Sequence, residues 1–191
     1  MKHVATAVAF LVLLAGAAFA QAPKTEIGVD FSMVNVHPST PQVTSFNFFG
    51  GGGSFTYNLG DWFGIKSDVQ WYTQGSGQKG GPLAGGNVSG NTFTYTFGPQ
   101  VKKHTGWFQP FGEALFGGAY SNVYANLYAP GGKASGSVSA SAFAMKLGGG
   151  LDVAVSKHFQ IEPAEVDYLY TGFAGSHQNN FAYAAGAKLT F

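Results

Sequence analysis

The sequence has no cysteine and no arginine, and it has few charged residues of either sign. Without cysteine, disulfide bonds cannot stabilise the fold. Charged residues make up 10% of the chain, whereas about 25% is usual for a soluble domain, whose surface needs charge to stay in solution. The near balance of 10 basic and 9 acidic residues gives no electrostatic basis for binding nucleic acid.

Long apolar runs are also missing beyond the N-terminal segment. Residues 1–20 combine the positive start Lys2-His3, an apolar run at 4–14 and the small-x-small motif AFA at 18–20. This pattern predicts a secretory signal peptide that is cleaved after Ala20, which leaves 21–191 as one domain. No part of 21–191 approaches 18 consecutive apolar residues, so a membrane-spanning helix is excluded and a closed β-barrel is the remaining way to cross a bilayer.

Glycine, with 29 residues, and aromatic residues, at 16% of the chain, are abundant instead. The clearest pattern is a period of two over residues 181–191, whose alternate positions form an apolar face with an aromatic residue at each end. That face comprises Phe181, Tyr183, Ala185, Ala187, Leu189 and Phe191. An aromatic-capped apolar face is typical of a strand in a membrane barrel, where aromatic girdles mark both interfaces.

Seven more alternating segments precede this one. The predicted strands cover residues 27–34, 45–58, 63–72, 92–101, 107–120, 143–155, 159–170 and 181–191. Short connections at 59–61, 102–106 and 156–158 alternate with long ones at 38–44, 74–90, 122–140 and 172–180. The alternation in the seventh segment slips by one residue near Pro163-Ala164, which predicts a β-bulge. The pattern predicts an all-β, eight-stranded, antiparallel up-and-down transmembrane barrel with short periplasmic turns and longer extracellular loops.

A soluble lipocalin-like barrel is the structural alternative, and it would place the apolar face inside. We favour the membrane barrel because the polar face is rich in small residues and poor in charge, which suits a narrow lumen. The run of glycines at 50–53 does not form a phosphate-binding loop, since neither a helix nor a Lys-Ser/Thr signature follows.

The polar faces carry charged residues that should meet inside the barrel. Because unpaired buried charges are costly, we expect a lumen of ion pairs and hydrogen bonds, with Lys188 and Glu165 as a pair on neighbouring strands. Catalysis by paired carboxylates is the less favoured interpretation, and eight strands leave room only for side chains, not for an open pore. The predicted lumen network comprises Asp30, Lys66, Asp68, Glu113, Lys146, Asp152, Glu165, Asp167 and Lys188.

The motifs GGGLD at 148–152, EVDYLYT at 165–171 and AGAKLTF at 185–191 resemble the small outer-membrane β-barrel family, the OmpA-like transmembrane domains often labelled porins. The resemblance implies a location in the bacterial outer membrane, contact with its lipids and insertion by the barrel-assembly machinery. It also implies that Phe191, with Phe181 and Leu189, forms part of the assembly signal. The sequence ends at the barrel, so we do not expect the peptidoglycan-binding domain of full-length OmpA.

Nothing in the sequence predicts a cofactor or a catalytic centre. The histidines of the predicted barrel fall in four separate connections, so a metal cluster is not expected: His37, His104, His158 and His177. For the basic residues of two short connections we favour solvated turns over contact with anionic lipid headgroups: Lys102, Lys103, His104, Lys157 and His158.

Three functions follow from these patterns. We favour a structural or interaction protein whose external loops meet partners. The second is transport of a small solute, including a hydrophobic one that leaves through a gap in the glycine-rich strands at 45–58 and 143–155. The third is modification of lipid A by an outward-facing site, for which only His37 and Ser39 are spaced suitably and no outward Glu accompanies them.

Overall fold

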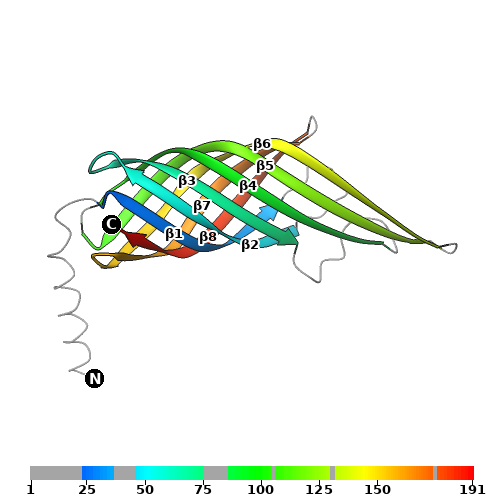
Figure 1. The fold of residues 1–191 in the computed structure, drawn as a ribbon, viewed down its shortest axis with the longest axis horizontal. Helices are drawn as coiled ribbons and strands as arrows, with labels where there is room; N and C mark the ends of the chain where they lie inside the picture. Colours follow the sequence, from blue (N-terminus) through cyan, green and yellow to red (C-terminus); the bar gives the residue numbers. More distant parts are fainter. Residues whose placement is uncertain (1–22, 37–45, 75–85, 105, 130–131, 174–175) are drawn as a thin grey trace, which may run out of the picture.

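The chain forms one closed barrel of antiparallel strands in the computed structural model, which describes residues 23–36, 46–74, 86–104, 106–129, 132–173 and 176–191. Each strand pairs with its neighbours in the sequence, and the first strand pairs with the last (Figure 1). The predicted fold, with its eight strands, is confirmed. The strands are β1 (Thr25–Val36), β2 (Phe46–Asn58), β3 (Phe63–Gln74), β4 (Gly86–Lys102), β5 (Phe108–Ala129), β6 (Gly132–Ser156), β7 (Phe159–Phe173) and β8 (Ser176–Thr190).

Apolar side chains lie outside the barrel and polar ones inside, the reverse of a water-soluble barrel. Phe31 on β1 is 62% exposed and Phe97 on β4 is 63% exposed, whereas the inward Lys66 on β3 is 1% exposed. A surface of bulky apolar residues around the wall suits lipid and would aggregate in water. The lipocalin-like alternative is therefore wrong. Among the described residues, no helix is long and apolar enough to span a bilayer.

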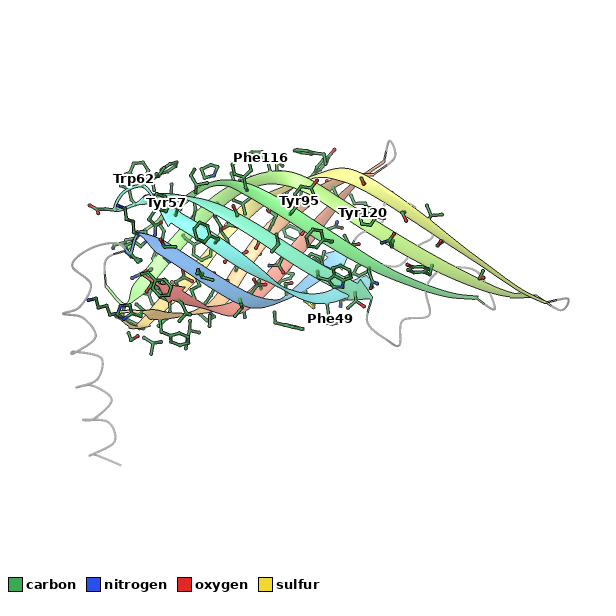
Figure 2. The ribbon with its side chains drawn as sticks, in the orientation of Figure 1. Phe49, Tyr57, Trp62, Tyr95, Phe116 and Tyr120 are labelled. Carbon is green, nitrogen blue, oxygen red and sulfur yellow. The ribbon has the colours of Figure 1, made fainter. Side chains whose placement is uncertain are left out.

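Aromatic contacts mark two levels on the outer wall. Near the end that holds Phe191 and the short turns, Trp62 packs edge-on against Phe63, with ring centroids 5.9 Å apart. Farther along the barrel, Trp71 and Phe93 have their centroids 6.2 Å apart. Figure 2 shows Trp62 at the first level. Two aromatic levels are the arrangement expected at the two interfaces of a membrane.

Most strands run past their predicted ends, and β4, β5 and β6 do so the farthest. β7 ends at Phe173 and β8 begins at Ser176, so the predicted loop at 172–180 is wrong. β5 and β6 stay paired from Phe108↔Val153 to Ala129↔Gly132, so the predicted loop at 122–140 is wrong. β4 starts at Gly86, which pairs with Leu127, and these strands extend beyond the others at one end of the barrel (Figure 1). The period of two fades there because Ser, Ala, Gly and Asn occupy both faces. A strand outside the membrane has no lipid-facing side, so neither face needs to be apolar. The predicted loop 38–44 and most of 74–90 lie outside the described residues.

The β-bulge near Pro163 is confirmed. Along the β7–β8 ladder the paired residues step from Glu162↔Gly186 to Glu165↔Ala184, so two residues of β7 oppose one of β8. Pro163 lacks an N–H and is tolerated at such a point. The bulge turns both Glu162 and Glu165 inward although they are three positions apart, and each is at most 4% exposed.

The seam between β1 and β8 closes the barrel. The backbone N–H of Phe191 donates to the carbonyl of Thr25 at 2.9 Å, and the Phe191 carbonyl accepts from Lys24 at 2.7 Å and from Thr25 at 3.1 Å. The ladder then continues from Glu26↔Thr190 to Asn35↔Phe181. The described strands therefore leave no open edge in the membrane wall, as a lipid environment requires.

Candidate functional site: the lumen network and the projecting sheet

The middle of the lumen holds a cluster of two amines and four carboxylates: Lys66, Lys146, Asp68, Glu113, Glu165 and Asp167. The Lys66 ammonium lies 2.8 Å from a Glu113 oxygen and 2.9 Å from a Glu165 oxygen. The Lys146 ammonium lies 3.1 Å from the other Glu165 oxygen. Glu165 therefore bridges the two amines, and the cluster ties β3, β5, β6 and β7 together across the lumen.

A second cluster lies nearer the short turns: Lys102, Lys188, Glu26, His104, Asp152 and Glu162. Lys102 is 2.6 Å from oxygens of both Glu26 and Asp152. Lys188 is 3.0 Å from the same Asp152 oxygen and also contacts Glu162. Asp152 thus joins β4 to β8, while His104 Nε2 contacts Glu26 at 3.1 Å.

Phe111 lies between the two clusters. Its ring centroid is 5.4 Å from the Lys66 ammonium and 4.4 Å from the Lys188 ammonium. Phe111 is 7% exposed, so these cation–π contacts are made away from water, where they are strongest. The ring occupies the space between the two clusters, which water would otherwise have to fill.

The lumen has fewer charges and then becomes apolar toward the projecting end. Gln70 donates to both oxygens of Asp30 at 2.9 Å and accepts from the Ser32 hydroxyl at 2.9 Å. Beyond Gln70 an apolar plug closes the barrel, formed by Val34, Tyr72, Leu169 and Ala182 with Phe48 packed against it. Side chains therefore fill the described part of the lumen from the turns to the plug, as a narrow eight-stranded barrel requires.

The structure places all nine residues of the predicted lumen network on the inner face, but it joins one pair differently. Lys188 contacts Asp152 and Glu162, not Glu165, which instead contacts Lys66 and Lys146. The strand register explains the error. It sets Lys188 opposite Gln160 and Glu165 opposite Ala184, four residues away along β8, so Glu162, opposite Gly186, lies nearer to Lys188.

The sequence interpretation also missed part of the second cluster. Lys102 and His104 were predicted to lie in a solvated turn, yet they are 3% and 6% exposed and pair with Glu26. The signal was present, since the inward alternation of β4 through Gln100 extends by one step to Lys102 and by another to His104. Lys103, Lys157 and His158, in the same group, are exposed as predicted.

The three residues of the predicted assembly signal lie on the outer surface at or beside β8. Phe181, Leu189 and Phe191 are 47%, 48% and 62% exposed. Their side chains face lipid, while the backbone of Phe191 pairs with the start of β1. Their role in assembly remains a prediction.

Oxygens of Glu113, Glu165 and Asp167 lie within 4.8 Å of one another, a spacing that could hold a metal ion. Lys66 and Lys146 already contact this group at 2.8–3.1 Å. Two ammonium groups supply the charge that a cation would bring, so we interpret the cluster as structural. Of the residues weighed for lipid A chemistry, His37 and Ser39 lie outside the described part of the chain.

The other distinctive feature is a three-stranded sheet that projects beyond the barrel, formed by residues 86–91 of β4, 122–129 of β5 and 132–142 of β6. The β3–β4 ladder ends at Thr73↔Asn91 and the β6–β7 ladder at Phe143↔Gly172. Within the described residues, 132–142 of β6 therefore have a strand partner on one side only. Side chains 135–142 are small, uncharged and mostly exposed.

Comparison with known proteins agrees with this geometry. A closed barrel with a lipid-facing apolar wall and a charged, filled interior defines an outer-membrane type of barrel. The sequence profile of the outer membrane protein beta-barrel domain matches residues 6–191, and the chain belongs to this family. A comparison with curated protein sequences finds no significant match.

Solved structures share the fold at low sequence identity. The attachment invasion locus protein Ail of Yersinia pestis is 15% identical, with a TM-score of 0.62 over 89% of this chain and 99% of Ail. The Ail structure in complex with the heparin analogue sucrose octasulfate gives 16% identity and the same TM-score over 89% and 99% of the two chains. Neisserial surface protein A is 15% identical, with a TM-score of 0.54 over 88% of this chain and 97% of that one.

Proposed function

We propose that this protein is a non-enzymatic barrel of the bacterial outer membrane that displays the projecting sheet as an interaction surface. Residues 1–20 would direct its export as a signal peptide and then be cleaved. The observation that carries the proposal is the contrast between the barrel's two parts. The lumen is closed by ion pairs and by the apolar plug, whereas the sheet extends outward with a one-sided β6 edge. Backbone N–H and C=O groups at such an edge can pair with an extended segment of another chain.

The small side chains of residues 135–142 favour this mode of binding. Ser, Ala and Gly keep the edge accessible and offer little side-chain specificity, so affinity would come from backbone hydrogen bonds. The Ail complex with sucrose octasulfate is a structural neighbour with an external ligand, which supports an outward-facing role for a barrel of this shape. The protein would enter the membrane through the barrel-assembly machinery, with Phe181, Leu189 and Phe191 read as the signal.

Removing the projecting sheet should abolish binding without unfolding the barrel. We expect cells that produce a variant with residues 122–139 replaced by a two-residue turn to lose adhesion to surfaces coated with extended peptides, the class of ligand whose backbone can pair with the β6 edge. The chain should still show heat-modifiable gel migration, because the deleted ladder lies beyond the β6–β7 pairing. A folded variant that adheres as well as the unaltered protein would overturn the proposal, as would an unaltered protein that adheres no better than cells without it.

Transport through the lumen is the competing function, and planar bilayers test it. The two charged clusters and the apolar plug fill the barrel, so we expect no current steps above the protein-free baseline, with a known porin as positive control. Lateral exit is disfavoured as well, since Gly50 pairs with both Ser32 and Tyr72, and Gly148 with both Glu113 and Asp167. Reproducible conductance steps would instead favour transport.

A further inference from the structure

A groove on the outer wall at the periplasmic end has charged groups of both signs at its rim. It has a volume of about 450 Å³ and lies between the β2–β3 turn and the adjacent ends of β4 and β5. Trp62, Val101, Pro110 and Gly112 supply most of its apolar lining, and Asp61 and Lys103 supply its exposed charges. The buried residues Lys102, His104 and Phe111 complete the lining. Trp62, which is 66% exposed, lies at this end of the barrel (Figure 2).

Backbone hydrogen bonds hold the groove in shape. The N–H of Lys102 donates to the Trp62 carbonyl at 2.9 Å, and the N–H of Lys103 donates to the Pro110 carbonyl at 3.0 Å. The ring of His104 lies 2.9 Å from the Asp61 carbonyl, through Nδ1. The turn and the two strand ends are therefore joined to one another, and the groove does not depend on a ligand to form.

Gly112 leaves the floor of the groove open. A β-carbon added there would meet only the Gly148 carbonyl at 3.7 Å and a Val101 methyl at 3.8 Å, both ordinary contacts. The barrel does not need glycine at this position for backbone packing. The missing side chain does, however, leave space in the groove beside Val101 and Pro110.

The two rim charges have no counterpart in the described structure. Asp61 and Lys103 are both exposed, and within the described residues neither is found in an ion pair. A carboxylate and an ammonium at one groove, above an apolar floor, complement a ligand that carries an ammonium and a phosphate at one end and a hydrocarbon chain at the other.

We propose that this groove binds one phospholipid of the periplasmic leaflet through a phosphoethanolamine headgroup. Lys103 contacts the phosphate, Asp61 accepts hydrogen bonds from the primary ammonium, and an acyl chain lies along Trp62, Val101 and Gly112. A phosphocholine headgroup has no N–H to donate to Asp61, and a phosphoglycerol headgroup has no cation, so both should bind more weakly. The site is at the opposite end of the barrel from the projecting sheet, and it does not depend on the proposed function.

The test uses quenching of Trp62 by phospholipids with brominated acyl chains. The other two tryptophans are replaced (Trp71→Phe, Trp107→Phe), and the full barrel is reconstituted in phosphatidylcholine vesicles that contain brominated phosphatidylethanolamine, phosphatidylglycerol or phosphatidylcholine. We expect brominated phosphatidylethanolamine to show a relative binding constant about fivefold above that of phosphatidylcholine, the size expected for one added charge contact near the surface.

Three variants and one control identify the site. Asp61→Asn should bring the ratio close to one, because it removes the contact that distinguishes the two headgroups. Lys103→Gln should change the ratio little, because both lipids carry the phosphate, and Gly112→Leu should bring it close to one by filling the groove without disturbing the backbone. Lys157→Gln, in another short turn, should leave the ratio unchanged, and heat-modifiable migration reports folding in each case. A ratio near one in the unaltered barrel, or a ratio that survives Asp61→Asn, would contradict the proposal. A preference for phosphatidylglycerol would also contradict it, because Lys103 alone would then select an anionic headgroup without a contribution from Asp61.

Discussion

Replacing Lys146 by methionine should lower the free energy of unfolding of the barrel by about 3–5 kcal/mol, the usual cost of removing one partner from a buried ion pair. Lys146 contacts Glu165 and Asp167 at 3.1 and 3.0 Å, and Asp68 at 3.3 Å. Methionine keeps most of the length of the side chain but leaves these carboxylates facing one another without the amine. Urea titration of the barrel in lipid vesicles, followed by tryptophan fluorescence, measures the change.

Lys157→Met provides the matched control, because Lys157 lies in an exposed turn and its loss should change stability by less than about 0.5 kcal/mol. Adding Asp167→Asn to the Lys146 variant should recover part of the loss, since it removes one of the stranded charges. Equal stability of the Lys146 and Lys157 variants would show that the central cluster does not depend on its second amine.

Replacing Gly186 by leucine should prevent the barrel from closing. A β-carbon at this position would lie 2.3 Å from the Val29 carbonyl and 2.9 Å from the Asp30 α-carbon, both backbone atoms of the neighbouring strand. Relief would require β8 to move away from β1, which breaks the seam, so we expect destabilisation of about 3 kcal/mol or more, at the upper end of overpacking effects. The folded band in unheated gels should be largely lost.

The adjacent residue gives the control for this substitution. Ala185 is exposed on the outer wall, and a leucine there would enter lipid, so Ala185→Leu should fold as well as the unaltered chain. If both variants fold to the same extent, the close approach at Gly186 does not limit closure.

The sequence predicts most of the barrel because lipid outside and a narrow lumen inside impose an alternation that can be read directly. Parity alone places Phe31, Phe97 and Phe181 outward and Lys66 inward, and the slip at Pro163 is visible as a break in that parity. Where the environment stops differing between the two faces, as in residues 122–142, the period disappears and the sequence predicts a loop where the strands continue.

Pairing inside the lumen could not be derived in the same way. Parity places Lys188 and Glu165 inward, but which amine meets which carboxylate depends on strand register and tilt. The register places Glu162 nearer to Lys188 than Glu165. Lys102 and His104 were missed for a different reason. Their sequence is typical of a turn, and only continuation of the β4 ladder shows that they enter the lumen.

The pairing of Thr25 with Phe191 has a consequence for how this protein reaches its native state. The two edges that must meet belong to the first and last strands of the barrel, so their contact closes a larger loop than any other strand pair and carries the highest entropic cost. Until that contact forms, β1 and β8 both carry unpaired backbone groups, which hydrocarbon does not tolerate. Insertion and closure should therefore occur together, and a catalyst that shelters both edges at once would accelerate the step that limits the rate.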